Sequence, residues 1–266
     1  MSFDPESGRN IKGIYLLPNL VTTAGLFAGF YAIVSAMNNS FENAAIALFI
    51  AMIMDGLDGR IARYTDTQSE FGAQYDSLSD MACFGITPAL VIYSWSLKSL
   101  GKLGWLVAFF YVAATALRLA RFNTQNITGI ENKHKKYFVG LPCPAAAAVV
   151  ASIVWIGTDF GLPVKLFKYE VAIVVASVAS LMVSNINYHN FKEIDLKGKV
   201  PFIVILLTLL ILLLVAWDPP KVLFIIFFFY ALSGIALSIV DLIVGFMRKR
   251  SEFAEVKRQV AAKDLE

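Results

Sequence analysis

Charge is scarce in this 266-residue chain: 16% of its residues are charged, whereas 58% are hydrophobic. A soluble domain of this size usually carries about a quarter charged residues. The composition therefore excludes an ordinary water-soluble fold and favours a polytopic membrane protein. The formal net charge of +3 is also too small to indicate a nucleic-acid-binding protein.

Cysteine and histidine are equally rare, with two of each. Cys83 and Cys143 lie in or beside apolar runs without disulfide or metal-site spacing, so we expect both to be small core residues. His134 and His189 fall in basic loops and have no partner at metal-binding spacing. A cleavable signal peptide is not visible either, because the first residues are polar and the first apolar run begins only near Leu16.

Long apolar segments are what the chain does have, and a transmembrane helix needs about 20 such residues. We predict an all-α membrane protein with about eight spans. They cover approximately residues 17–37, 41–63, 71–97, 103–122, 141–157, 169–186, 200–217 and 222–247. Gly25 and Gly29 in the first span fit close helix packing, and the charged tail after Arg248 fits a helix at the membrane surface.

The distribution of lysine and arginine predicts the orientation of these spans. With the N-terminus in the cytoplasm, an even number of spans returns the C-terminus there. Most of the 23 basic residues then lie on the cytoplasmic side, and the other side holds only Lys98, Lys102, Lys165, Lys168 and Lys221. This orientation puts the end of the second span and the start of the third at the cytoplasmic face.

Six acids interrupt the apolar sequence between Met54 and Asp80: Asp55, Asp58, Asp66, Glu70, Asp76 and Asp80. Asp55 and Asp58 are three residues apart, and Asp76 and Asp80 are four apart, so each pair shares one face of a helix. A short turn joins the two helices antiparallel, which lets the two faces meet. Because carboxylates crowded at a membrane cannot stay unpaired, we predict a site for Mg²⁺ or Mn²⁺ completed by a substrate phosphate.

Small and basic residues accompany the acids. Gly56, Gly59, Ala62 and Gly72 allow the backbone to approach a phosphorylated ligand closely. Arg60 and Arg63 supply cations where phosphate charge would lie. The alternative is that the acids pair with these arginines and only join helices, but two arginines cannot neutralise four aspartates.

The spacing Asp55-x2-Asp58-Gly59-x2-Ala62-Arg63-x8-Gly72-x3-Asp76-x3-Asp80 resembles the signature of the CDP-alcohol phosphotransferase family at every defined position. The resemblance implies a six-helix membrane core, usually dimeric, that displaces CMP from a CDP-linked donor with two divalent metal ions, Mg²⁺ or Mn²⁺. It implies that Asp55, Asp58, Asp76 and Asp80 bind metal and that Asp80 is also the general base. It further implies contacts to the CDP-linked donor from Asn19, Thr22, Gly59, Ala62, Arg63, Ser69 and Gly72.

Further stretches resemble the membrane-embedded phosphatidylserine synthases within that family, notably ALRLARFN at 116–123 and GLPCPAAA at 140–147. This resemblance covers roughly residues 14–195 and implies CDP-diacylglycerol and L-serine as substrates, with phosphatidylserine and CMP as products. We therefore predict a core over residues 1–195, two additional spans over 196–250 and a charged cytoplasmic tail over 251–266.

Serine is a zwitterion, so its site needs a cation for the carboxylate. Arg118 and Arg121 are three residues apart at the cytoplasmic end of the fourth span, next to Asn123. An arginine inside a span should face a cavity or an anion. We predict that at least one of the two, with Asn123, binds serine or a substrate phosphate; the alternative is that they extend to the interface.

Two other interpretations stay open at this point. The same reaction could use another acceptor, namely glycerol 3-phosphate, inositol phosphate or choline. An ion-coupled transporter is a remote alternative, because its acids should lie near mid-membrane and be scattered over several spans.

Overall fold

A computed structural model of the chain describes residues 16–127, 137–164, 166–189 and 202–238. The predicted surface tail, the loop with His134 and residues 190–201 lie outside these ranges. The named elements, in chain order, are α2 (Leu16–Met37), α3 (Phe41–Tyr64), α4 (Glu70–Asp80), the π-helix η1 (Met81–Ile86), α5 (Thr87–Trp95), the 3₁₀ turn η2 (Leu97–Leu100), α6 (Lys102–Ile127), β1 (Tyr137–Val139), α7 (Cys143–Asp159), α8 (Lys168–Val183), β2 (Asn187–His189) and α9 (Phe202–Trp217).

The first two helices form a tight antiparallel hairpin. Asn39 adopts φ 60° in the turn between them, a conformation that asparagine tolerates better than most residues. Glycines then let α2 approach its neighbours: a Cβ on Gly25 would lie 3.3 Å from Cβ of Met54, and one on Gly29 would lie 2.9 Å from Sγ of Cys83. The predicted close packing at these two glycines is confirmed.

Helices α4, η1 and α5 follow one another without a break and match the predicted third span. Pro88, in the first turn of α5, lacks the N–H that would reach the carbonyl of Phe84 in an α-helix. The buried hydroxyl of Tyr111 on α6 donates to that carbonyl at 3.2 Å. The side chain of Tyr111 thus supports the π-helix that directly follows Asp80.

A small antiparallel sheet, which the sequence patterns did not predict, ties the chain before α7 to the chain after α8. In it Tyr137 is paired with His189, and Val139 with Asn187. Because the chain turns into β2, α8 ends at Val183 rather than near Ile186, where the predicted sixth span ended.

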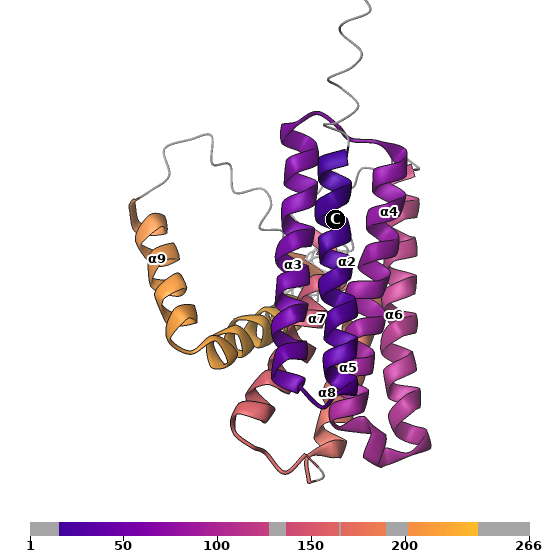
Figure 1. Cartoon of the computed structure of the whole chain (residues 1–266), viewed down its shortest axis with the longest axis vertical. Helices are drawn as coiled ribbons and strands as arrows, with labels where there is room; N and C mark the ends of the chain where they lie inside the picture. Colours follow the sequence, from indigo (N-terminus) through magenta and orange to yellow (C-terminus); the bar gives the residue numbers. More distant parts are fainter. Residues whose placement is uncertain (1–15, 128–136, 165, 190–201, 239–266) are drawn as a thin grey trace, which may run out of the picture.

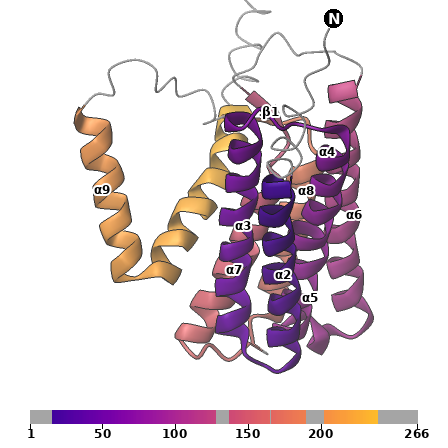
Figure 2. The ribbon, with the colours of Figure 1, turned by 45° about the horizontal axis from the view of Figure 1, so that its top comes forward.

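The helix bundle formed by α2 to α8 contains the core, and α9 lies apart from it (Figure 1). Almost every side chain of α9 is exposed. The chain then turns back near Asp218, and Figure 2 shows the following helix, Pro219–Ser238, returning to the bundle. That helix touches α3 directly, because the rings of Phe49 and Phe227 are 6.2 Å apart.

The prediction of a helical membrane protein is confirmed. Four of the described helices are long and apolar enough to cross a membrane: Leu17–Met37, Glu70–Trp95, Lys102–Gln125 and Pro219–Ser238. Helices α7 and α9 are apolar but shorter, and α3 has the length but carries several charges near one end. The total of eight spans stays a prediction.

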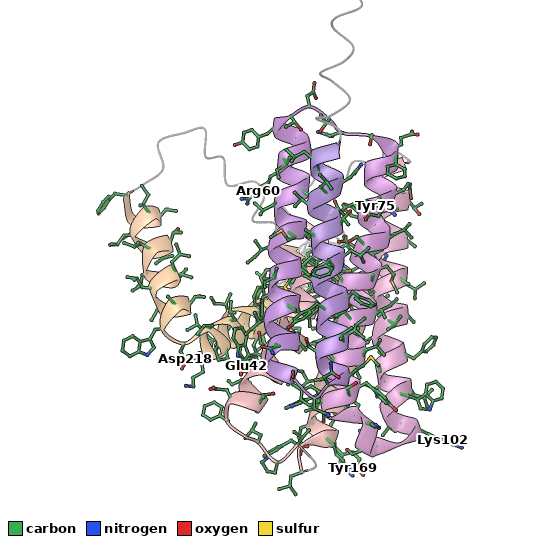
Figure 3. The ribbon with its side chains drawn as sticks, in the orientation of Figure 1. Glu42, Arg60, Tyr75, Lys102, Tyr169 and Asp218 are labelled. Atoms are coloured by element: carbon green, nitrogen blue, oxygen red, sulfur yellow. The ribbon has the colours of Figure 1, made fainter. Side chains whose placement is uncertain are left out.

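The bundle has two ends that differ in chemistry. Arg60 and Tyr75 lie toward one end, and Glu42, Lys102 and Tyr169 toward the other (Figure 3). The first end contains the start of α2, the end of α3, the start of α4 and the end of α6. We call it the acidic end, because the aspartates of α3 and α4 lie in this part of the bundle.

Candidate functional site

Three carboxylates from two helices meet near the acidic end. One side-chain oxygen each from Asp55 on α3 and from Asp76 and Asp80 on α4 lie within 4.8 Å of one another, and all three residues are half-buried. The short connection between Tyr64 and Glu70 holds α3 and α4 antiparallel, as predicted. The one-face spacing of the acids therefore becomes one cluster in space.

Asp58 lies beside this cluster rather than within it. Its side chain is 5% exposed, and Oδ2 accepts a hydrogen bond from Oγ1 of Thr22 at 2.7 Å. The same hydroxyl lies 3.1 Å from the carbonyl of Pro18, so α2 helps fix Asp58. All four aspartates nevertheless line one hollow, which agrees with the prediction that they converge.

That hollow has an empty volume of about 190 Å³, including space open to solvent. Besides the aspartates and Thr22, its lining includes Gly25, Ala51, Ser79, Cys83 and Phe84. Sequence reasoning assigned no site role to these five. The sequence spacing could have indicated two of them: Ser79 and Cys83 follow Asp76 at three and seven residues and so share its helical face. Cys83 is also buried, as predicted.

The donor set fits a hard divalent cation. Carboxylate oxygens are the ligands that Mg²⁺ and Mn²⁺ prefer, and three of them already lie close enough together for one ion to reach. The alternative, in which the acids pair with neighbouring arginines, is not supported by Arg63: it is exposed, and its Nε donates to the carbonyl of Gly59 at 3.0 Å. Asp55, Asp76 and Asp80, with Asp58 beside them, are the residues that would hold a metal.

Glycines keep the surface beside the acids open. A Cβ added at Gly56 or Gly59 would meet nothing within 4 Å. At Gly72 it would meet Oγ of Ser69 at 3.1 Å and Oδ1 of Asn19 at 3.5 Å. The residues predicted to contact the nucleotide thus lie along the end of α3 and at the starts of α2 and α4. Of these residues, Thr22 lines the hollow with the aspartates.

Ser69 and Ala62, also predicted to contact the nucleotide, have structural partners in the turn between α3 and α4. Ser69 caps α4, because its Oγ accepts a hydrogen bond from the backbone N–H of Gly72 at 3.0 Å. The carbonyl of Ala62 accepts from the N–H of Thr67 at 3.0 Å and so closes the turn after α3.

Two polar residues at the end of α6 bind different elements: Arg121 binds the end of α8, and Asn123 binds α4. Arg121 donates to the carbonyls of Val183 and Ser184 and to Oδ1 of Asn185, which satisfies the open end of α8. The side chains of Asn123 and Ser77 hydrogen-bond each other at 3.1–3.3 Å, and this contact joins α6 to α4 next to Asp76.

Arg118 is placed differently. It is half-buried, and among the described residues its NH1 donates to Sγ of Cys143, at 3.3 Å. Its buried Nε has no hydrogen-bond partner within the described part of the chain. Of the two arginines predicted for the serine site, Arg118 is the one with donor capacity to spare.

The family model for CDP-alcohol phosphatidyltransferases matches residues 15–183, which is most of the chain. The chain belongs to this family. The match runs from the start of α2 to the end of α8, so it contains all four aspartates and both arginines, whereas α9 and Pro219–Ser238 begin beyond it.

Named relatives are 32–39% identical to this chain over the aligned residues. A CDP-diacylglycerol–serine O-phosphatidyltransferase of Helicobacter pylori is 37% identical over 199 residues, which cover 73% of this chain and 81% of the relative. One from Mycobacterium tuberculosis is 39% identical over 155 residues, 58% of this chain and 54% of the relative. An archaetidylserine synthase of Methanothermobacter thermautotrophicus is 32% identical over 182 residues, 68% of this chain and 72% of the relative.

Proposed function

We propose that this protein transfers the phosphatidyl group of CDP-diacylglycerol to the hydroxyl of L-serine, giving phosphatidylserine and CMP. The observation that carries the proposal is the carboxylate cluster of Asp55, Asp76 and Asp80 inside a segment that matches the CDP-alcohol phosphatidyltransferases. The choice of acceptor is supported by relatives named for serine transfer that align over most of this chain.

In this proposal the four aspartates hold two divalent ions, Mg²⁺ or Mn²⁺. Metal ions bound there supply positive charge that offsets the diphosphate and the charge developing on the departing CMP. The open backbone at Gly56 and Gly59 leaves room for the nucleotide. Thr22 lines the hollow with the aspartates, and the nucleotide is proposed also to contact Asn19, Ala62, Arg63, Ser69 and Gly72.

Asp80 is proposed to be the general base. It accepts the proton of the serine hydroxyl while the serine oxygen forms a bond to the phosphorus that carries diacylglycerol. The bond from that phosphorus to the CMP oxygen breaks, and CMP leaves with the electron pair. Arg118, whose buried Nε has no hydrogen-bond partner in the described part of the chain, is proposed to hold the carboxylate of serine.

The position of the acids also argues against the transporter interpretation. The cluster comes from two consecutive helices, whereas an ion path needs groups distributed over several spans. We further propose that the acidic end and both termini face the cytoplasm, that the protein works as a homodimer, and that α2 to α8 form the catalytic core to which the last two helices are added.

Purified protein with CDP-diacylglycerol and Mn²⁺ tests the proposed reaction. Serine, glycerol 3-phosphate, inositol phosphate and choline are offered one at a time, and CMP release is measured against a sample without acceptor. We expect release above background with serine alone, and phosphatidylserine in equal amount. Release with one of the other acceptors and none with serine would overturn the assignment.

A further inference from the structure

Helix α4 carries Asp76 and Asp80 but has few apolar contacts of its own. Its side chains Phe71 and Leu78 are each 70% exposed, and Ser79 is the one buried residue of this helix, all of which the structure describes. Helices in a membrane associate through packed side chains and through hydrogen bonds between helices. The part of α4 before Ser79, which includes Asp76, therefore depends chiefly on its polar contacts.

The two neighbours of Asp76 in the chain hydrogen-bond two different helices. Tyr75, labelled in Figure 3, has its hydroxyl 2.9 Å from Oγ1 of Thr23 on α2, in an exposed contact. Ser77 meets Asn123 on α6 in a half-buried contact: Nδ2 of Asn123 donates to Oγ at 3.1 Å, and Oγ lies 3.3 Å from Oδ1. Water replaces an exposed hydrogen bond at little cost, whereas a buried polar group that loses its partner stays unsatisfied. The Ser77–Asn123 contact is therefore the stronger constraint on α4.

The end of α6 is itself anchored. Arg121 donates to the carbonyls of Val183 and Ser184 at 3.2 and 3.4 Å and so binds the end of α8. Asn123 follows two residues later, and side chains two residues apart on an α-helix point roughly 200° apart. Arg121 and Asn123 therefore bind neighbours on opposite sides, and α6 connects the end of α8 to the turn of α4 that contains Asp76.

The acids give this connection a purpose. One oxygen each from Asp55, Asp76 and Asp80 lie within 4.8 Å of one another, and like charges so close repel one another until a cation lies between them. A small rotation of α4 about its axis would relieve that repulsion by turning the Asp76 carboxylate away from Asp55. Because Ser77 directly follows Asp76, a hydrogen bond at Ser77 opposes this rotation.

We propose that Asn123 is a positioning residue for the metal site: through Ser77 it holds the Asp76 carboxylate toward Asp55 before a metal ion binds. Groups that orient the ligands of a metal change metal affinity when they are removed. This inference rests on the proposed function and deepens it, because it assigns to Asn123 the orientation of a metal ligand instead of the contact to serine or a phosphate that the sequence predicted.

The test compares Ser77→Ala and Asn123→Ala with wild type in a Mn²⁺ titration of the purified protein without substrates, followed by electron paramagnetic resonance. A neutral hydrogen bond corresponds to roughly a two- to tenfold change in an equilibrium constant, so we expect each variant to raise the dissociation constant for Mn²⁺ by about that factor. The double variant should bind no more weakly than either single one, because the two side chains form one contact. Thr23→Val, which removes the exposed contact to Tyr75, is the matched control and should bind Mn²⁺ like wild type.

Two further readouts separate positioning from other roles of Asn123. Ser77→Thr keeps a hydroxyl at this position and should bind Mn²⁺ like wild type. KM for serine should rise no more in Asn123→Ala than in Ser77→Ala, and a rise confined to Asn123→Ala would make Asn123 a substrate contact and overturn the positioning role.

Unchanged Mn²⁺ binding in both alanine variants, with or without a lower thermal midpoint, would also overturn that role, because the contact would then support only the fold. A wild-type protein that binds no Mn²⁺ would overturn the proposed metal site and this inference with it. One that binds Mn²⁺ but releases no CMP with serine would overturn only the proposed acceptor.

Discussion

Each of the four aspartates near the acidic end is held in place by a small number of contacts. Asp55, Asp76 and Asp80 present oxygens to one point, and such like charges repel one another unless a cation lies between them. Asp58 is held from outside by Thr22. The four aspartates are therefore not equivalent, and their substitutions should give different results.

Replacement of the proposed base should separate chemistry from binding. We expect Asp80→Asn to lower CMP release by roughly 10²–10⁴-fold, the usual worth of a general base. Binding of CDP-diacylglycerol, measured separately by calorimetry, should largely survive. Asp66→Asn is the matched control, because Asp66 is exposed in the turn at φ 51° and asparagine accepts that conformation. Loss of binding together with activity would make Asp80 a metal ligand and nothing more.

The hydrogen bond from Thr22 to Asp58 should affect how tightly the site binds metal. Thr22→Val keeps the shape of the side chain but leaves Asp58 buried without this donor. A hydrogen bond to a charged group contributes about 1.5–3 kcal/mol, so the Mn²⁺ concentration for half-maximal activity should change by roughly tenfold or more.

Two companion variants of Thr22→Val show whether Asp58 carries the effect. Thr22→Ser should restore the wild-type Mn²⁺ dependence. Thr23→Val, whose hydroxyl meets Tyr75 rather than an acid, should leave it unchanged. Equal Mn²⁺ dependence in Thr22→Val and wild type would exclude a metal-site role for this contact.

At the scale of whole elements, helical periodicity accounts for much of what the sequence predicted. The spacing of Asp55, Asp58, Asp76 and Asp80 on two adjacent helices was enough to predict one cluster, because helical geometry fixes which residues share a face. Contacts between distant elements leave no comparable pattern. The cap that Arg121 forms on α8 and the sheet between β1 and β2 depend on tertiary packing, which a local pattern does not encode.

The π-helix after Asp80 also depends on a contact between distant elements, which a local sequence pattern does not encode. The hydroxyl of Tyr111 donates to the Phe84 carbonyl, so Tyr111→Phe would leave a buried carbonyl with one donor fewer. We expect the free energy of unfolding to fall by about 1–3 kcal/mol, seen as a lower thermal midpoint in detergent. Because η1 follows Asp80 directly, kcat should fall as well.

Tyr93→Phe, on the partly buried face of α5, serves as the control for this variant, with midpoint and kcat unchanged. A Tyr111→Phe protein that loses stability but keeps the wild-type kcat would show that η1 supports the fold without positioning Asp80.

The bundle has an acidic end and an opposite end that carries lysines. We propose from the distribution of Lys and Arg over the whole chain that the acidic end faces the cytoplasm. Both native cysteines are buried, so single cysteines can be introduced without removing them. Tyr64, 92% exposed at the end of α3, and Lys102, exposed at the start of α6, lie at opposite ends of the bundle.

Impermeant maleimide labelling of intact cells should modify Lys102→Cys and not Tyr64→Cys, and labelling of opened membranes should modify both. The wild-type protein, unlabelled in either case, is the control. Labelling of Tyr64→Cys alone in intact cells would reverse the proposed orientation and place the acid cluster outside the cytoplasm.

The most direct test of a single cation site formed by these aspartates is a Mn²⁺ titration of the purified protein followed by electron paramagnetic resonance. Wild type and Asp66→Asn should bind Mn²⁺ alike, and Asp76→Asn should lose that binding, because it removes one of the three carboxylates whose oxygens lie within 4.8 Å. Mn²⁺ bound as tightly by Asp76→Asn as by wild type would contradict the site.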